Sequence, residues 1–357
     1  MKKEDNRKKS ARHGPRWRLR FDDWPAQARS RWNAAFKAGD PIDDCGPAAH
    51  HSDRTRQQLL YHCEWFLGFL EAHYPELLAR PPAERLDAKI IAHYVAECRK
   101  SCRDTTIAGY LQKLRFALII LCPTGDWSWL LAIAKRIAAQ APRRPERHHL
   151  VTSERLYALG VELMDRAMTG AATREKPSKA QAFQYRDGLI IAFLALIPLR
   201  RRTLAALRIK KQLVKVGETW ALDIPAEDTK TRRALDYPVS PELSECIDVY
   251  LSRFRCRIPG ADNHDGLWAS NQGRSMDHGS IYLAVWKRTR QAFGFPINLH
   301  RFRHAAATFW SMQDPANVRG VKDLLGHSSF RPTETNYIMA RSRIAGRALA
   351  RAIDSRK

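Results

Sequence analysis

The chain lacks any apolar run long enough to cross a membrane. The longest run, residues 189–199, has eleven residues and contains Pro198, whereas a helix that spans a bilayer needs about 20. The N-terminus is basic, but no apolar segment follows it, so the sequence also lacks the pattern of a secretory signal. We therefore expect no membrane span and no secretion.

Signs of a metal centre or a disulfide framework are also missing. There are seven cysteines, an odd number, and none of them forms a CxxC pair. That pattern argues against paired disulfides and against a Cys-rich zinc site. No GxxxxGK[ST] phosphate loop and no clustered carboxylate signature for paired metals is found either. The sequence predicts a protein of a reducing compartment that uses no metal and no other cofactor.

Positive charge is what the chain has in excess. Lys and Arg number 61 against 37 Asp and Glu, which gives a net charge of +24 and a pI near 10.1. A surplus of this size favours a polyanionic partner, and nucleic acid is the commonest one. With 357 residues, 44% of them hydrophobic, the chain is long enough for two or three domains with buried cores.

Composition and periodicity divide the chain into three parts. Residues 1–53 begin with nine Lys or Arg among the first 20 residues and are predicted to be a basic arm and extension. Apolar residues then recur at helical spacing, so the first packed unit is expected to begin after residue 53 and to form a helical domain over 54–145. A Pro-rich and charged stretch separates this domain from a second one, residues 151–357.

The second domain combines helices with a few short strands. Residues 182–197 form a strongly apolar helical segment that Pro198 ends. Short β patterns follow at 213–216, 220–224 and 235–239. Helical patterns resume at about residue 241. The expected fold class is therefore mainly α with a small antiparallel β-sheet.

One segment of this domain carries a His-x-x-Arg pair on a patterned helix. At 100° per residue, His300 and Arg303 lie 60° apart, while Phe302, Ala305 and Phe309 cluster on roughly the opposite face. We therefore expect His300 and Arg303 to point together away from the helix's buried side. The HxxR spacing alone is unspecific, because it also occurs at residues 13–16 and 51–54.

Three consecutive arginines, Arg200, Arg201 and Arg202, follow the apolar helix. One interpretation is a basic surface cluster at a helix C-terminus, which the helix dipole favours. The alternative is that at least one guanidinium is held at a buried helix end, where its planar fork can bind two phosphate oxygens. The run by itself does not decide between them.

Four segments of the second domain stand in an informative order: PLRRRTLAAL, DTKTRRALDYPVS, LHRFRHAAATF and VKDLLGHSSFRPTETNYI. This order resembles the tyrosine recombinase, or phage-type integrase, family, with its GLRxxEL motif, β-hairpin lysine, HxLRHTxAT motif and LGHxSxxTTxxY box. Pro198 and Thr203 stand where the family has glycine and glutamate, and the interval from His327 to Tyr337 is one residue longer than in many members. The residues that match the family's catalytic set are Arg200 (with Arg201 as the alternative), Lys230, His300, Arg303, His327 and Tyr337.

The resemblance implies a fold and a chemistry. The fold would be an all-helical core-binding (SAM-like) domain followed by a mixed α/β tyrosine recombinase catalytic domain. In the chemistry, the phenol of Tyr337 attacks a DNA phosphorus and leaves a 3′-phosphotyrosyl link. The two arginines and His327 bind the phosphate oxygens, His300 manages the phenol's proton, and Lys230 protonates the departing 5′ oxygen.

The resemblance also implies partners. These are double-stranded DNA with specific recombination sites, three further copies of the chain in a tetramer on DNA, and possible accessory proteins. The long basic arm favours a phage or another mobile element, and the expected location is the cytoplasm, with the nucleoid. Candidate DNA contacts outside the catalytic set are Thr106, Lys113, Arg201 and Arg202. An apolar stripe at 344–353 predicts a C-terminal helix that packs on its own domain or on a neighbouring subunit.

Two other functions stay open at this point. A type IB topoisomerase uses a similar set of residues on a single duplex. A DNA-binding protein of the same fold without chemistry is the other alternative, which the complete residue set disfavours.

Overall fold

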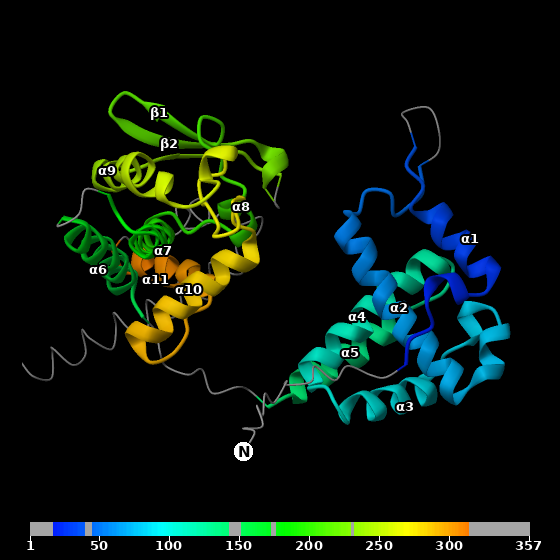
Figure 1. The fold of residues 1–357 in the computed structure, drawn as a ribbon. Helices are drawn as coiled ribbons and strands as arrows, with labels where there is room; N and C mark the ends of the chain where they lie inside the picture. Colours follow the sequence, from blue (N-terminus) through cyan, green and yellow to red (C-terminus); the bar gives the residue numbers. More distant parts are fainter. Residues whose placement is uncertain (1–16, 40–44, 143–150, 173–175, 230–231, 314–357) are drawn as a thin grey trace, which may run out of the picture. The chain divides into compact units, whose positions relative to one another are not determined.

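The computed structural model describes residues 17–39, 45–142, 151–172, 176–229 and 232–313. The chain divides into two compact units, residues 1–146 and residues 147–357 (Figure 1). Each unit is treated by itself below. Among the described residues, no helix combines the length and the apolar character that a membrane span requires.

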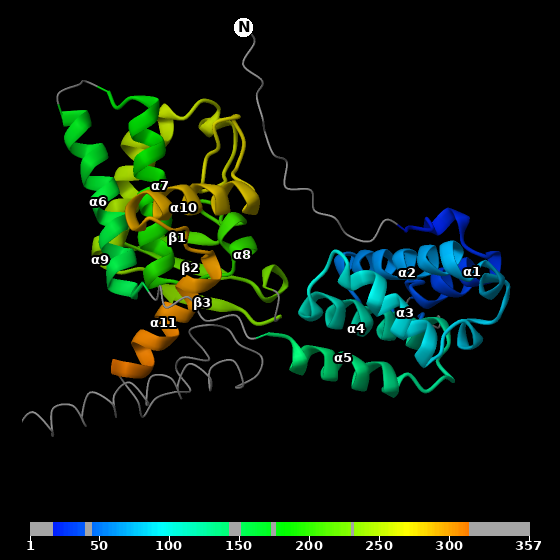
Figure 2. The same ribbon diagram turned by 90° about the horizontal axis from the view of Figure 1, so that it is seen from below.

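Unit 1 is helical throughout its described part. Local sequence explains several helix starts: the Ser52 side chain accepts a hydrogen bond from the Thr55 backbone N–H, and Asp87 accepts two, from Lys89 and Ile90. Two long helices, α2 and α4, pack against each other, and α5 runs beside α4 (Figure 2). The α-helices of unit 1 are α1 (Ala26–Ala35), α2 (Asp53–His73), α3 (Ala88–Arg99), α4 (Asp104–Leu121) and α5 (Ser128–Gln140).

The core of unit 1 begins earlier in the chain than the sequence predicted. Trp24 and Trp32 are 2% and 0% exposed and belong to the same apolar cluster as the residues of α2 and α4. The backbone at residues 18–19 crosses α2 at Gly68, where an added Cβ would lie 2.4 Å from the Arg18 nitrogen. Packing therefore starts near residue 17, not after residue 53. Trp24 and Trp32 precede the residues whose apolar periodicity predicted the first packed unit, so that pattern did not reveal their burial.

Unit 2 is built around α7, which is buried on nearly all sides. The side chains of residues 189–194 are completely buried, so this helix forms the centre of the core. Helix α6 packs along it, and Gly160 and Gly188 permit the close approach, because a Cβ on Gly188 would lie 2.7 Å from the Gly160 carbonyl oxygen. In the described part of unit 2 the α-helices are α6 (Ser153–Ala172), α7 (Lys179–Leu196), α8 (Arg201–Ala205), α9 (Pro241–Val249), α10 (His278–Phe293) and α11 (Leu299–Gln313).

A three-stranded antiparallel sheet lies between α8 and α9 in the sequence. Its strands β1 (Leu213–Val216), β2 (Thr219–Ile224) and β3 (Leu235–Pro238) pair in the order β1-β2-β3. The buried side chain of Leu222 on the central strand is paired with Leu213 on one side and Tyr237 on the other. The described residues thus confirm the expected fold class of a mainly helical protein with a small antiparallel sheet.

Candidate active site

The end of α7 turns sharply at Pro198. The Leu199 N–H donates to the Ile197 carbonyl at 2.7 Å, so three residues reverse the chain direction directly after the helix. Proline suits this position because its fixed φ and missing N–H prevent the helix from continuing. Arg200 follows in extended conformation and occupies the N-cap position of the short helix α8.

Helix α11 brings Arg303 to this turn. Arg303 is only 7% exposed, and its Nη1 donates a hydrogen bond to the carbonyl oxygen of Pro198, 105 residues earlier in the chain. The expectation that Arg303 points away from the buried side of the helix is therefore wrong, and Phe309, expected on that side, is 37% exposed. Helical periodicity gives the angle between side chains on one helix but does not say which other segments pack against them. The turn at Pro198 covers the face of α11 that carries Arg303, which the sequence pattern had predicted to be exposed.

The site contains two arginine side chains, those of Arg200 and Arg303, that are partly removed from water. Burial, together with the positive charge of Arg200, lowers the pKa of Arg303 to about 10. Burial also lowers the pKa of Arg200, and for both arginines the phenol of Tyr237 on β3 acts in the opposite direction. Both guanidiniums remain charged at neutral pH. Two neighbouring, partly desolvated cations favour an anion with several oxygens, such as a phosphate diester.

His300 belongs to the same charged surroundings. Its pKa is lowered by burial and then by His304, Arg303, Arg301 and Arg200, so the imidazole is neutral at neutral pH and can accept a proton. The ring of His304 lies 4.8 Å from that of His300, centroid to centroid. Sequence reasoning missed His304 and Tyr237 as neighbours of the site. The spacing of four residues between His300 and His304 could have indicated His304, whereas no local pattern in the sequence indicates Tyr237.

Arg201 and Arg202 are exposed at the start of α8. The interpretation as a cluster at a helix C-terminus is wrong, because α7 ends at Leu196 and these residues open the next helix. The guanidinium of Arg201 lies 5.8 Å from the ring centroid of Tyr282 on α10. Arg200, by contrast, is half-buried.

Three members of the predicted catalytic set, Lys230, His327 and Tyr337, lie outside the described residues, as do the stripe at 344–353 and the basic arm before residue 17. Their assignment continues to rest on the sequence. Within the described part of the chain, no group of three or more His, Cys, Asp or Glu side chains is arranged to hold a metal ion.

The two DNA-contact candidates of unit 1 lie on α4. Thr106 is exposed in its first turn, and Lys113 is half-buried two turns later. Burial, with the positive charge of Lys113 as a smaller cause, lowers the pKa of His62 on α2 to about 4. A cation is thus presented beside a neutral, partly buried histidine.

Comparison with known proteins supplies the family. The model of the phage integrase family matches residues 164–343, half of the chain, and this segment contains α7, the sheet and α11. The chain belongs to the phage integrase family. The matched segment also contains all six residues of the predicted catalytic set.

The individual relatives are tyrosine recombinases. The chain is 27% identical to XerD of Chlamydia pneumoniae over 128 residues, which is 36% of this chain and 41% of that protein. It is 28% identical to XerC of Mycobacterium sp. (strain KMS) over 142 residues, 36% of this chain and 47% of that one. With XerC of Shewanella oneidensis it shares 32% identity over 92 residues, 25% and 29% of the two chains. The chain thus spans less than half the length of these curated relatives.

Two solved structures are similar over most of this integrase-family chain. XerA recombinase matches with a TM-score of 0.41 and 16% identity, covering 90% of this chain and 98% of its own. XerH, a site-specific recombinase solved as a post-cleavage complex with a palindromic difH substrate, matches with a TM-score of 0.46 and 14% identity, covering 90% and 94%.

Proposed function

We propose that this chain is a site-specific DNA recombinase that cuts and rejoins DNA strands through a 3′-phosphotyrosyl intermediate. The observation that carries the proposal is the hydrogen bond from Arg303 to the Pro198 carbonyl, because it brings the HxxR helix to the turn that precedes Arg200. Two motifs about 100 residues apart in the sequence thereby contribute to one cationic site. Family membership and the tyrosine recombinase relatives support the same conclusion.

The described residues account for part of the chemistry. As negative charge grows on the two non-bridging oxygens of the pentacoordinate phosphate, Arg200 and Arg303 stabilise it with charge-assisted hydrogen bonds. Neutral His300 accepts the proton of the attacking phenol, which has an ordinary pKa of about 10 and needs this help at neutral pH. These two roles require no metal ion and no cofactor.

Residues known from the sequence complete the reaction. The phenol oxygen of Tyr337 forms a bond to phosphorus, the bond between phosphorus and the 5′ oxygen breaks, and the 5′ oxygen takes a proton from Lys230. His327 donates a further hydrogen bond to the phosphate. Because the phosphodiester energy is kept in the protein–DNA bond, a 5′ hydroxyl can attack it later and rejoin the strands without ATP.

The biological setting that we propose is a phage or another mobile element, with four copies of the chain acting on two duplexes, possible accessory proteins, and activity on DNA in the cytoplasm. Support comes from the basic N-terminal arm and the net charge of +24. The DNA contacts that we propose outside the catalytic set are Thr106, Lys113, Arg201 and Arg202.

Formation of a covalent adduct tests the proposal. The target site is first found by footprinting the protein on the DNA that flanks its gene, and a nicked duplex of that site is then incubated with the protein and resolved on a denaturing gel. Wild type should form the adduct, and Tyr337→Phe should form none while binding the site with an affinity within about twofold of wild type.

Two outcomes would overturn the proposal. An adduct that survives Tyr337→Phe would refute the nucleophile, and the absence of any adduct with wild-type protein would refute the chemistry. Supercoil relaxation without joining of paired sites would assign the chain to topoisomerase-like cleavage instead.

A further inference from the structure

A buried threonine joins α10 to the connection that leads into α11. Thr289 on α10 is completely buried, and its Oγ1 accepts a hydrogen bond from the backbone N–H of Ile297 at 2.9 Å. The same hydroxyl donates within its own helix, with Oγ1 2.8 Å from the Val285 carbonyl oxygen and 3.3 Å from that of Trp286. Because its single proton is used within α10, the lone pair that meets the Ile297 N–H has a fixed direction.

The residue that Thr289 holds lies two positions before α11. Gly294 ends α10 in a left-handed conformation with a φ of 76°, and Pro296 has no N–H to donate. Ile297 follows and is only 4% exposed; its side chain packs in the core of unit 2 while its N–H bonds to Thr289. The chain is therefore fixed directly before the helix begins.

Asn298 continues this restraint into α11. Its side-chain Oδ1 accepts a hydrogen bond from the His300 N–H at 3.2 Å, and its carbonyl oxygen accepts from the Arg301 N–H at 2.8 Å. The two residues before α11 thus bond to α10 on one side and to the first turn of α11 on the other. Because a helix is stiff, the place where it begins determines where the side chains of its first two turns lie.

We propose that Thr289 is a positioning residue for His300 and Arg303, and that its hydroxyl sets where α11 presents them to the turn at Pro198. The inference rests on the proposed function, in which Arg303 binds the phosphate and His300 accepts the proton of the phenol. The bond from Arg303 to the Pro198 carbonyl joins residues 105 positions apart, so it depends on how α11 is placed. A displacement of about 1 Å at a catalytic group can cost about 100-fold in rate.

Removal of the hydroxyl alone tests this role. Thr289→Val has nearly the same shape but takes away the acceptor of the Ile297 N–H, whereas Thr289→Ser keeps a hydroxyl. Each variant would be assayed on the nicked site for the rate of adduct formation at saturating protein, for DNA affinity, and for the midpoint of the fall in rate at acid pH. Thermal unfolding would be recorded as well, so that lost stability is measured separately.

Thr289→Val should form the adduct about tenfold to a hundredfold more slowly than wild type at about pH 8. Its affinity for DNA should stay within about threefold of wild type, because affinity depends on phosphate contacts that a buried hydroxyl does not make. The acid midpoint should rise towards the ordinary histidine value of about 6.5, because a loosened start of α11 gives water access to His300, whose pKa is lowered chiefly by burial. Thr289→Ser should stay within about threefold of wild type in rate and keep its midpoint.

Ser244→Ala on α9 is the matched control. Ser244 is 1% exposed, and its Oγ accepts a hydrogen bond from the Trp220 N–H at 3.0 Å, so this change also removes the acceptor of a buried N–H in unit 2. Both Ser244→Ala and Thr289→Val should unfold at a lower temperature than wild type. Only Thr289→Val should slow cleavage and move the acid midpoint.

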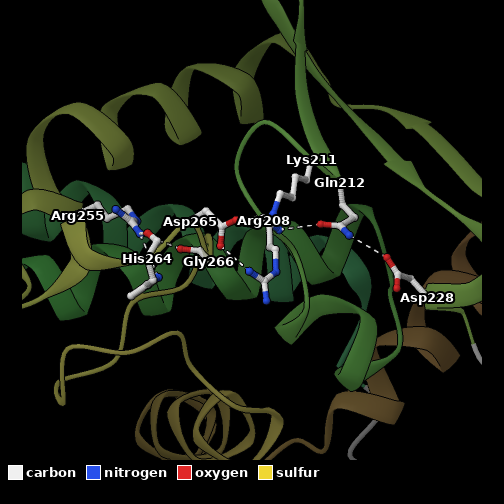
Figure 3. Close-up of polar contacts among 8 residues, drawn as sticks. All are labelled: Arg208, Lys211, Gln212, Asp228, Arg255, His264, Asp265 and Gly266. Carbon is white, nitrogen blue, oxygen red and sulfur yellow. Dashed lines mark hydrogen bonds and ion pairs between the residues drawn. The ribbon is translucent and has the colours of Figure 1, made fainter.

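A second control loosens a loop that contributes no residue to the proposed catalytic set. Arg255 is 7% exposed, and its Nη2 donates to the carbonyl oxygens of His264 and Gly266 at 2.8 and 2.9 Å (Figure 3). The charged groups that lower the pKa of His300 lie on α11 and at residue 200, outside this loop. Arg255→Lys, which removes the planar fork, should therefore reduce stability and leave the acid midpoint unchanged.

The outcomes separate this inference from the proposed function. If wild type forms no adduct, both fail. If Arg303→Ala slows cleavage while Thr289→Val keeps either the wild-type rate or the wild-type midpoint, only the role of Thr289 is refuted, and the same holds if Ser244→Ala reproduces both changes. Should Thr289→Val not fold, Asn298→Ala, at an exposed position, must show the slower cleavage and the higher midpoint in weaker form, with recovery in Asn298→Ser, and their absence would refute the inference.

Discussion

Helix α11 of unit 2 and helix α4 of unit 1 present their cations in opposite ways. On α11, Arg303 is buried and donates a hydrogen bond to a backbone carbonyl, and burial together with the charge of Arg200 lowers the pKa of Arg303. On α4, Lys113 is half-buried and Thr106 is exposed. A cation fixed in a desolvated site is suited to stabilising charge that develops in a reaction, whereas a partly solvated one is suited to reversible phosphate contact. The comparison predicts that Arg303 on α11 contributes to DNA cleavage and that Lys113 on α4 contributes to DNA affinity.

Arg303→Ala should give the largest effect. We expect the rate of covalent adduct formation to fall about 10²- to 10³-fold, as for other donors to a transition-state oxyanion, with DNA affinity changed by less than about threefold. Adduct formation under single-turnover conditions and a binding titration measure the two quantities.

Arg301→Ala, which replaces an exposed arginine on the same helix, is the matched control. Because Arg301 also lowers the pKa of His300, cleavage is compared at about pH 8, where the imidazole is neutral in both proteins, and should stay within about threefold of wild type. An Arg303→Ala variant that loses affinity and cleavage by the same factor would make Arg303 a binding residue and remove the contrast with Lys113.

The pH dependence of cleavage should report His300. Because burial and neighbouring cations lower the pKa of His300 below its ordinary value of 6.5, the imidazole is neutral above that lowered pKa and serves as a base. The rate should therefore fall as pH decreases through the lowered pKa, by about tenfold for each further pH unit. Cleavage rates measured between pH 4.5 and 8 on the nicked site would show this acid limb.

Substitutions sharpen the pH test. His300→Asn should flatten the acid limb, and His304→Gln should keep it but move its midpoint upward, because His304 contributes to lowering the pKa of His300. An acid limb with an unchanged midpoint in His300→Asn would assign the titration to another group.

Lys113→Ala should give the smallest effect and the opposite pattern. The affinity for DNA should fall a few-fold and the slope of log affinity against log salt should become shallower by about 0.9, as expected for one lost phosphate contact. Cleavage at saturating protein should be unchanged. Gln112→Ala, an exposed neighbour on α4, is the control, and an unchanged salt slope in Lys113→Ala would exclude this residue from the DNA contact.

Much of the fold could be predicted because its signals are local. Apolar periodicity and the proline after α7 predicted this helix, and the short β patterns predicted the three strands, nearly to their observed ends. The Trp24 and Trp32 segment was misjudged, because burial of an aromatic residue outside a periodic pattern depends on which distant helix covers it.

Some residues of the candidate site could likewise be predicted from the sequence, and others could not. The identity of Arg200, His300 and Arg303 came from motif order, which the sequence contains in full. The contributions of the Pro198 carbonyl, His304 and Tyr237 did not, since each depends on contacts made in the folded chain.

By itself, the sequence determined that the protein is basic, that it is mainly helical with a small sheet, and that it contains the motif residues of its family. Only the tertiary structure decided that Arg303 turns inward against the Pro198 carbonyl and stands in the electrostatic field of Arg200. The physical reason is that a helix's own periodicity orders its side chains around one axis, whereas burial and pKa depend on what a second element places against them.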